Sequence, residues 1–398
     1  MDKKMTNTIS QQALEQYRND TTGCESIVHF NNAGTSLPPD IVVDTVIDYL
    51  REEALVGGYE MEAKHLARIE TVYEQIAKLI GADKSEVAVC ENASAAWLTA
   101  FKGLRLQPGD EVITCELEYA SNLMGLIDAR KAGVIITVIG NDERGNFPLE
   151  KLEAAINPST KLIAVTHIPS SGGGMLPITA IGAIAKKHGI LYMVDACQTA
   201  GQYPIDVNVI GCDILSATGR KYLRAPRGTG FLYVRASVQD RIAPLLIDQH
   251  AVQQLTPTDY TLRPDARRYE CYEKNRALML GMGKAIEYAL TVGVEAIWER
   301  VQGLATHARA ALRTIPGVTV HDIGDELCGI VTFSVAGMDS LVLRDALIAR
   351  GINVSFSGPS ATLLYMNKRK LTGIVRASIH YYNTEEEITQ LCEMLSTL

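Results

Sequence analysis

The sequence lacks the features that mark membrane, nucleic-acid-binding or secreted proteins. Its longest apolar runs have the length of a β-strand, far short of a bilayer span. The formal net charge of −8 at pH 7 argues against a surface for nucleic acids or anionic lipids. The first ten residues are polar, without the apolar stretch of a secretory signal, and we expect a loose N-terminal tail over residues 1–20. We therefore expect neither nucleic acid nor membrane as a partner.

Cysteine pairs and a dinucleotide-binding glycine fingerprint are also missing. The eight cysteines are spread singly, with no CxxC pair and no histidine at metal-ligand spacing. This pattern predicts no metal site, reduced thiols and a cytoplasmic location. Cys90, Cys115 and Cys197 lie within or just after apolar runs, as small core residues do. The glycines at 172–174 lack the GxGxxG spacing, so a nicotinamide-binding site has little support.

The order of apolar patterns along the first part of the chain predicts an α/β fold. At 398 residues the chain suits two domains. Helices are predicted over residues 42–54, 62–79, 94–104, 122–131, 149–156 and 178–188, and strands over residues 86–90, 111–115, 134–139, 161–166, 191–194 and 231–234. This alternation gives βαβ units and a largely parallel sheet, whose ligand lies beyond the carboxyl ends of the strands.

The pattern changes after residue 235. Residues 240–273 are irregular, with three prolines and many charges. Beyond them, helices are predicted over residues 275–290, 294–314, 340–350 and 385–395, and short strands over residues 330–335, 353–356 and 374–378. We therefore expect a large ligand-binding domain over residues 21–254 and a small C-terminal α+β domain over residues 255–398.

A carboxylate and a lysine follow neighbouring strand units at the expected ligand-binding edge. Asp195 ends the apolar run 190–194, and Lys221 follows the next unit. Pyridoxal phosphate chemistry needs this pair, because the lysine forms a Schiff base and the acid keeps the pyridinium nitrogen protonated. Gln198, one helical turn after Asp195, would donate to the ring hydroxyl oxygen. For Asp195 alone, a structural acid that caps the next turn is the alternative.

Positive charge surrounds the lysine in the sequence. Arg220, Arg224 and Arg227 flank Lys221, and such a run is usually a solvated face. Here it follows an apolar strand, so the cationic neighbours would lower the pKa of the lysine and free its amine to attack a carbonyl. The arginines could also hold a phosphate or a substrate carboxylate.

Further candidates each have a structural and a functional interpretation. The turn over residues 91–96, with Asn92 as N-cap, is either an ordinary helix start or a phosphate cradle. Tyr119 and His167 follow strands, where such residues are on their own more often part of the core. Arg376 lies in a short apolar strand and needs an anion, either a substrate carboxylate or a structural ion-pair partner.

With these residues assembled, the chain resembles the class V aminotransferase superfamily of pyridoxal-phosphate enzymes with fold type I. The resemblance extends from Phe30-Asn31-Asn32-Ala33-Gly34-Thr35 to the segment 375–384. Within that group the chain is similar to cysteine desulfurase-like proteins, isopenicillin-N-epimerase-like proteins and hercynylcysteine sulfoxide lyases. The resemblance implies a large domain with a mostly parallel sheet between helices, a smaller α+β domain, and a homodimer with the active site at the interface.

The resemblance also implies a role for each matching residue. Lys221 matches the Schiff-base lysine, Asp195 the pyridinium partner and Gln198 the contact to the ring hydroxyl. The remaining matches are phosphate contacts at Ala93, Ser94, Thr218 and Arg220, ring stacking by Tyr119, a substrate and cofactor contact at Ser170, a carboxylate-binding Arg376, and a substrate-side turn at Asn32, Ala33 and Gly34. The catalytic set would be Lys221, Asp195 and Tyr119.

Two segments depart from the family pattern. Desulfurases carry sulfur on a cysteine shortly before the carboxylate-binding arginine, whereas residues 355–365 contain no cysteine and Cys328 lies outside them. Many members also have a threonine that touches the phosphate of the partner subunit. At that position Glu273 would repel a phosphate, so we expect the contact to be absent or remodelled, with Arg224 or Arg227 compensating.

These features predict an enzyme that removes the Cα proton of an amino-acid substrate, with the released Lys221 as base. We expect a C–S lyase that performs β-elimination on a cysteine-derived substrate without a persulfide cysteine. Class V transamination and epimerisation are the alternatives, because residue types do not separate these outcomes. A non-catalytic protein on the same fold is the third interpretation, and the intact Asp195 and Lys221 weigh against it.

Overall fold

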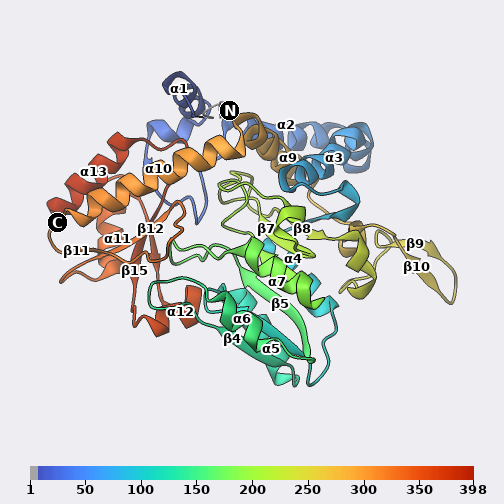
Figure 1. Cartoon of the computed structure of the whole chain (residues 1–398). Coiled ribbons are helices and arrows are strands. Elements are labelled where there is room, and N and C mark those ends of the chain that lie inside the picture. Colours follow the sequence, from blue (N-terminus) through green and yellow to red (C-terminus); the bar gives the residue numbers. More distant parts are fainter. Residues whose placement is uncertain (1–7) are drawn as a thin grey trace, which may run out of the picture.

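Two β-sheets and the helices around them organise the chain (Figure 1). The structure is a computed structural model and describes residues 8–398. The first seven residues of the expected N-terminal tail lie outside the described residues. Helix α1 (Gln11–Asn19) begins at the N-cap Ser10, and Arg18 at its end pairs with Glu387 at 2.8 Å. The N-terminal segment is thereby attached to the last helix of the chain.

The larger sheet has seven strands in the order β2-β8-β7-β6-β5-β3-β4. Its strands are β2 (Val87–Cys90), β3 (Glu111–Cys115), β4 (Ile135–Ile139), β5 (Thr160–Thr166), β6 (Leu191–Asp195), β7 (Ile214–Thr218) and β8 (Gly230–Val234). Strand β8 runs antiparallel to both of its neighbours, and the pairs from β7 to β4 are parallel. The expected α/β class with a largely parallel sheet is confirmed.

Helices cover both faces of this sheet, so its central strands are buried on both sides. Along β6, Met193 packs in the cluster with α4 and α5, while Val194 packs in the cluster with α3, α7 and α9. Such strands read as continuous apolar runs because no face is solvated. The helices are α2 (Asp40–Val56), α3 (Gly58–Ile80), α4 (Ala93–Gly103), α5 (Ala120–Lys131), α6 (Leu149–Ala155), α7 (Ile178–His188), α8 (Val207–Ile210) and α9 (Arg276–Val292).

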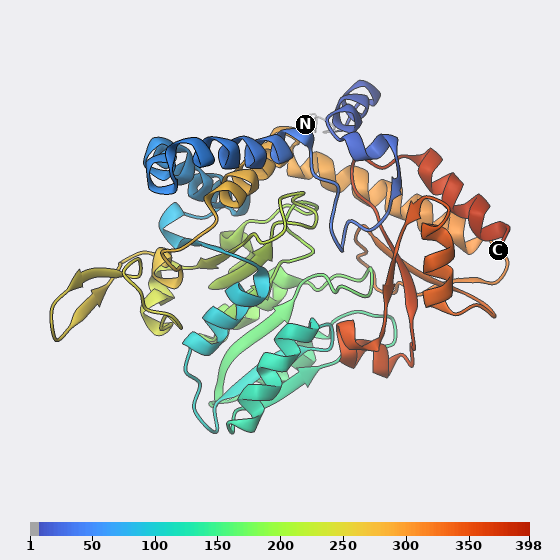
Figure 2. The same ribbon diagram turned by 180° about the vertical axis from the view of Figure 1, so that it is seen from behind.

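The smaller sheet is antiparallel, with strand order β11-β12-β15-β14 (Figure 2). Its strands are β11 (Val318–Val320), β12 (Ile330–Val335), β14 (Ser355–Ser357) and β15 (Ile374–Ser378). Helices α10 (Val294–Arg313), α11 (Ser340–Ile348) and α13 (Glu385–Ser396) share one apolar cluster with it, and α12 (Leu363–Lys368) follows β14. A two-residue strand, β1 (Val28–His29), pairs in parallel with β13 (Ile352–Asn353) and brings the N-terminal segment to this part of the chain.

The segment that was expected to be irregular, residues 240–273, contains a hairpin. Strands β9 (Val252–Leu255) and β10 (Tyr260–Leu262) pair antiparallel and project from the rest of the molecule (Figures 1 and 2). Single 3₁₀ turns lie at Thr22–Glu25, Lys84–Glu86, Ala236–Arg241, Ala266–Tyr269 and Pro359–Thr362. The proposed domain boundary at residue 255 stays a prediction.

No single helix within residues 8–398 is both long and apolar enough to cross a membrane. The bent pair formed by α9 and α10 reaches the required length and apolarity only when the two helices are taken together.

Candidate active site

A cavity lies where the parallel strands of the larger sheet end, as expected for an open α/β sheet. It is lined by Asn92, Ala93, Ser94, Tyr119, Asn122, Thr166, Ile168, Ser170, Asp195, Cys197, Gln198, Thr218, Arg220 and Lys221. All nine residues predicted to bind the cofactor are in this set. They come from positions 93 to 221 of the chain, so the fold brings together side chains that are distant in sequence.

Asp195 is a buried carboxylate without a cation. It ends β6, beside β7, and is 4% exposed. Its Oδ1 accepts the Cys197 backbone N–H at 2.8 Å and its Oδ2 accepts the Asn122 side-chain amide at 2.8 Å. No ion pair to Asp195 occurs within residues 8–398. An ionised carboxylate in the interior needs a positive partner, and the cavity beside it is where such a partner can bind.

Lys221 supplies an amine with no partner of its own in the described part of the chain. The residue is 8% exposed, and its Nζ lies 5.8 Å from the centroid of the Tyr119 ring. The pKa of Lys221 is lowered, first by burial and further by the charges of Arg220 and Arg376, although Asp195 opposes this. The predicted direction is therefore right, but burial is the larger cause. A lowered pKa favours the neutral amine that attacks carbonyl groups.

The turn between β2 and α4 offers free backbone amides to the cavity. Asn92 caps α4 by accepting the N–H of Ala95 at 2.9 Å. The turn lies against Gly230 at the start of β8, where a Cβ would be 2.7 Å from the carbonyl oxygen of Ala217 and 3.2 Å from the nitrogen of Ala93. Only glycine permits this approach. The start of an 11-residue helix with small residues is suited to a phosphate.

The predicted substrate-side turn borders the cavity through its backbone. Gln198 donates from Nε2 to the carbonyl oxygen of Ala33 at 3.1 Å, and Arg220 donates to that of Gly34. The side chain of Asn32 is engaged elsewhere, since its Nδ2 donates to the Ser378 carbonyl oxygen at 2.7 Å. Neither Asn32, Ala33 nor Gly34 is among the cavity-lining residues. Their substrate contacts stay a prediction.

Arg376 is a buried cation without an acidic partner in residues 8–398. It donates from Nη1 to the carbonyl oxygen of Ser170 at 2.6 Å and from Nη2 to Oδ1 of Asn31 at 3.4 Å, while its Nε has no partner within the described residues. Burial lowers the pKa of Arg376 to about 10. The alternative from the sequence, a structural ion pair, is not present in this part of the chain. The arginine therefore suits an anion beside the cavity-lining Ser170.

Arg224 makes structural contacts away from the cavity. The guanidinium of Arg224 bonds to the Leu37 carbonyl oxygen at 2.8 Å and to Thr21 and Tyr381 at 2.5 Å each, and lies 4.4 Å from the centroid of the Tyr382 ring. Arg224 is therefore engaged away from the cavity, and of the two arginines expected to compensate at the phosphate only Arg227 stays a prediction.

His167 is a core residue, in line with the structural interpretation. Its Nδ1 lies 2.9 Å from Oγ1 of Thr199, and burial lowers the pKa of His167 to about 3, so the ring is neutral.

Four cavity residues were not identified as site residues from the sequence: Asn122, Thr166, Ile168 and Cys197. Cys197 was interpreted as a packing residue, and only its position two residues after Asp195 could have indicated the cavity. Thr166 ends β5, so it could have been found from the rule that ligands bind at strand ends. Asn122 lies four residues after the acidic residue Glu118, which follows β3, and this spacing is its only signal in the sequence.

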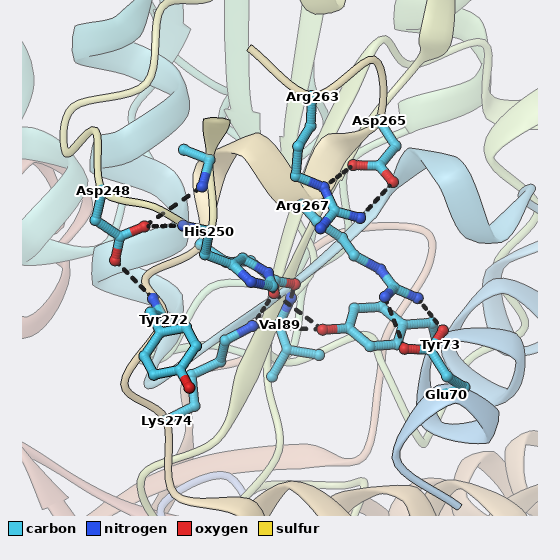
Figure 3. A network of polar contacts seen from close by, with 12 residues as sticks. Glu70, Tyr73, Val89, Asp248, His250, Arg263, Asp265, Arg267, Tyr272 and Lys274 are labelled. Atoms are coloured by element: carbon cyan, nitrogen blue, oxygen red, sulfur yellow. Dashed lines mark hydrogen bonds and ion pairs between the residues drawn. The ribbon is translucent and has the colours of Figure 1, made fainter. Parts of the chain in front are cut away.

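The segment after the hairpin is tied to β2 by a buried carboxylate. Glu270 accepts the backbone N–H of Val89 at 2.6 Å and the hydroxyl of Tyr73 at 2.9 Å. His250 lies 3.2 Å from it and Lys274 forms an ion pair with it. Figure 3 shows the side chains of Tyr73, His250 and Lys274 converging on this point. Because β2 leads into the turn that caps α4, the network fixes the strand that positions this turn beside the cavity.

Glu273, at the position where many family members have a phosphate-contacting threonine, is exposed and does not line this cavity. Its expected effect on a phosphate of the partner subunit stays a prediction.

Comparison with known families identifies the family of the chain. The sequence model of one family, described as Aminotransferase class-V, matches residues 28–391. The chain belongs to the class V aminotransferase family. Membership confirms the expected fold, the pyridoxal 5′-phosphate cofactor and the assignment as an enzyme.

Several curated relatives span nearly the whole chain. A protein of Methanothermobacter thermautotrophicus named probable cysteine desulfurase is 30% identical over 390 residues, which cover 96% of this chain and 98% of the relative. A Synechocystis protein of the same name is 30% identical over 381 residues, covering 93% of this chain and 90% of the relative.

Solved structures show the same architecture. The apo cysteine desulfurase of Thermococcus onnurineus NA1 superposes with a TM-score of 0.90 at 27% identity, covering 96% of this chain and 97% of that one. A cystine C–S lyase in complex with its product cysteine persulfide superposes with a TM-score of 0.86 at 19% identity, covering 94% and 99%. At that identity the second likeness shows the fold alone.

The residues of the cavity fit the cofactor. Asp195 lacks a cation for its charge, Lys221 has a free amine, and the start of α4 offers unpaired amides. Gln198 also has a buried Oε1 without a partner in the described residues, so this amide has unused capacity where a ring hydroxyl would lie. When bound, the cofactor supplies an electron sink for charge that develops at the substrate Cα.

Proposed function

We propose that the protein is a C–S lyase that removes a thiol from a cysteine-derived amino acid by β-elimination. The observation that carries the proposal is the pairing of a partnerless Lys221 amine with the cation-free Asp195 at one cavity. The curated relatives are named for an activity on cysteine, which supports a sulfur-containing substrate. The bond broken would be Cβ–S, and water would convert the remaining carbon skeleton to pyruvate and ammonia.

Each polar residue at the cavity has a defined task in this proposal. Lys221 holds the cofactor, and its amine, once released, takes the proton from the substrate Cα. Asp195 pairs with the ring nitrogen and keeps it protonated, and Tyr119 covers the ring. Arg376 binds the substrate carboxylate through two hydrogen bonds, which orients Cα toward the base. The leaving thiolate then departs with the electron pair of the broken bond.

The proposal includes no sulfur transfer to a protein cysteine. Residues 355–365, which form β14 and the turn that leads into α12, contain no cysteine. Cys328 is fully buried. Cys197 does line the cavity, but burial and the charge of Asp195 raise the pKa of its thiol well above the usual value. A protonated thiol is a poor nucleophile, so we propose that Cys197 packs rather than reacts.

Product analysis of the holoenzyme tests the reaction. With S-substituted cysteines we expect pyruvate, ammonia and the free thiol in equal amounts. A keto acid formed together with the amine form of the cofactor would assign the protein to the aminotransferases, and inversion at Cα without other products would make it an epimerase. Mass spectrometry after turnover should find no persulfide on the eight cysteines, and a persulfide on Cys197 would contradict the proposed role of that residue.

We also propose that the protein forms a homodimer. Helices α2 and α3 expose a set of large apolar side chains, namely Ile41, Val43, Ile47, Leu50, Leu55, Val56, Tyr59 and Leu66. Leu55 is 85% exposed and Tyr59 is 69% exposed. Exposed large apolar side chains gathered on two adjacent helices are typical of an interface, and a second copy of the chain is the partner expected from the family resemblance.

A cytoplasmic location is proposed from the chemistry of the thiols. All eight cysteines lie within the described residues and each is unpaired. Unpaired thiols persist in reducing compartments. Fractionation of the native cells should place the protein with the cytoplasmic enzymes, and recovery outside that fraction would contradict the proposal.

A further inference from the structure

A second buried carboxyl lies behind Asp195. Glu118 follows β3 and is 1% exposed. The side-chain amide nitrogen of Asn122 donates to Oε2 of Glu118 at 3.0 Å and to Oδ2 of Asp195 at 2.8 Å. One amide therefore uses both of its hydrogens to bridge two carboxyl groups, although Asp195 is 73 positions from Asn122.

Glu118 is held by neutral donors only. Thr166 donates to Oε2 at 2.9 Å and Thr114 donates to Oε1 at 3.2 Å. No ion pair to Glu118 occurs within residues 8–398. Burial, and then the charge of Asp195, raise the pKa of Glu118 to about 7, although the bond from Asn122 opposes this. The charged group facing Glu118 is Asp195 from β6, and the other titratable group is the thiol of Cys115 on β3.

We propose that Glu118 is a positioning residue that acts through Asn122 to orient the Asp195 carboxylate and to keep it ionised toward the cofactor ring. The proposal rests on the proposed role of Asp195 as partner of the ring nitrogen. Glu118 and Asn122 do not touch the reacting atoms in this scheme, and their effect passes through Asp195.

The orientation of the Asn122 side-chain amide follows from hydrogen-bonding chemistry. The side-chain amide of Asn122 could point either its nitrogen or its oxygen toward Asp195. Once the cofactor neutralises Asp195 and Glu118 is ionised, Glu118 can only accept, so it selects the nitrogen, because the oxygen of the amide would repel a carboxylate. The same nitrogen then donates to Asp195. A glutamine at position 118 carries a donor as well as an acceptor, so it no longer enforces this choice.

The pairing of Glu118 and Asp195 around one amide also affects which carboxyl group is charged. Two ionised carboxylates in the interior repel each other, and one of them takes up a proton. Before the cofactor binds, Glu118, which lies away from the cavity, is the member that takes up the proton, as its pKa of about 7 indicates. When a protonated ring nitrogen neutralises Asp195, the repulsion on Glu118 falls and its proton is released more readily.

The test measures the protonation of the cofactor ring rather than activity. Holoenzyme is reconstituted with pyridoxal phosphate carrying nitrogen-15 in the ring, and the nitrogen chemical shift is followed as pH rises from neutral to alkaline. In Glu118→Gln and Asn122→Ala we expect the ring nitrogen to lose its proton at lower pH than in the wild type. Cofactor affinity should fall about tenfold, the size of one lost hydrogen bond to a charged group.

Glu116→Gln is the matched control. Glu116 is also buried and lies two residues before Glu118, but its carboxylate pairs with Lys368 at 2.8 Å. This variant should keep the wild-type nitrogen titration even if its stability falls. A wild-type titration in both Glu118→Gln and Asn122→Ala would overturn the proposal.

Asp195→Ala separates this proposal from the one on which it rests. If the ring nitrogen stays protonated in Asp195→Ala, the proposed role of Asp195 fails. If Asp195→Ala loses the proton while Glu118→Gln and Asn122→Ala retain it, only the role of Glu118 fails.

The apoprotein gives an independent readout. The folded-state pKa of Glu118, about 7, lies above its unfolded value, so stability present at acid pH is lost as pH rises through 7. Glu118→Gln cannot ionise and lacks this loss. Its urea midpoint relative to the wild type should therefore increase from acidic to neutral pH. A constant difference between the two proteins would contradict the pairing of the two carboxyls.

Discussion

At the scale of single residues, the site is built from buried charges that the chain leaves without opposite partners. Asp195 has no cation and Arg376 has no acid within residues 8–398, and both are buried. Isolated buried charges destabilise a fold, so the presence of Asp195 at the cavity and of Arg376 beside the cavity-lining Ser170 indicates ligands of opposite charge. A ring cation for Asp195 and a substrate carboxylate for Arg376 satisfy both.

Arg376→Ala should raise KM steeply for substrates with an α-carboxylate, because the bidentate contact is lost while the proton transfer at Lys221 is intact. Arg376→Lys should recover only part of the effect, since a lysine lacks the forked geometry. Steady-state kinetics on wild type and both variants measures this. An unchanged KM in Arg376→Ala would assign the arginine to structure.

The residues that sequence patterns could predict are those whose position in a strand already indicates their chemistry. Asp195 and Lys221 follow strand units, and Arg376 interrupts an apolar strand. Asn122 could not be predicted as a partner of Asp195, because that contact depends on how β3 and β6 are placed across the sheet. The structural contacts of Arg224, one of the two arginines considered for the phosphate, could not be predicted for the same reason, since its partners come from distant segments at both ends of the chain.

At the scale of elements, the turn between β2 and α4 is held from two sides. Gly230 on β8 lets the neighbouring backbone approach it, and Glu270 anchors β2 through Val89. The proposed phosphate cradle would therefore depend on Gly230 and Glu270, which support the turn and do not line the cavity. Helix and strand ranges around this turn were predicted from the sequence to within a few positions, because apolar periodicity determines them.

The hairpin of β9 and β10 was missed because its residues are mostly exposed and carry little apolar periodicity. Strand β7 was also absent from the predicted strands. An apolar strand was expected before Lys221, but it was given no residue range.

Gly230→Ala should weaken cofactor binding, because the new methyl group would lie 2.7 Å from the Ala217 carbonyl oxygen and push the β2–α4 turn away from the cavity. Titration of the apoprotein with pyridoxal phosphate measures the dissociation constant. We expect this constant to rise about tenfold or more, as for the loss of one hydrogen bond to the phosphate.

Gly303→Ala is the control for this substitution. Gly303 lies within α10 and a methyl group there would meet nothing within 4 Å. The control should bind cofactor like the wild type and be slightly more stable, as expected for alanine in a helix. Equal affinity in the Gly230 and Gly303 variants would contradict the role of the close approach.

At the scale of the whole molecule, the apolar surface on α2 and α3 has no partner in the described chain. Figure 1 shows these helices together on the outside of the molecule, with α9 beside them. Exposed apolar side chains of this size favour association. Helix α3 also contacts the segment that supports the β2–α4 turn, because Tyr73 on α3 donates to Glu270. Association and the geometry of the site are therefore connected through α3.

Sedimentation velocity tests the homodimer. The wild type should sediment as a dimer, and Leu55→Glu should shift it toward monomer, because a charge would have to be buried in the interface. Val209→Glu is the control, since Val209 is also an exposed aliphatic residue but lies on α8. A monomeric wild type, or equal effects of the two substitutions, would contradict the proposed surface.

The most direct test of the account is to locate the lysine that holds the cofactor. The holoenzyme is reduced with borohydride, which fixes the cofactor to its lysine, and the digested protein is analysed by mass spectrometry. We predict that the phosphopyridoxyl group is found on Lys221 and that Lys221→Ala shows neither this product nor the visible absorbance of the bound cofactor. Attachment at another lysine, such as the buried Lys274, would contradict the account.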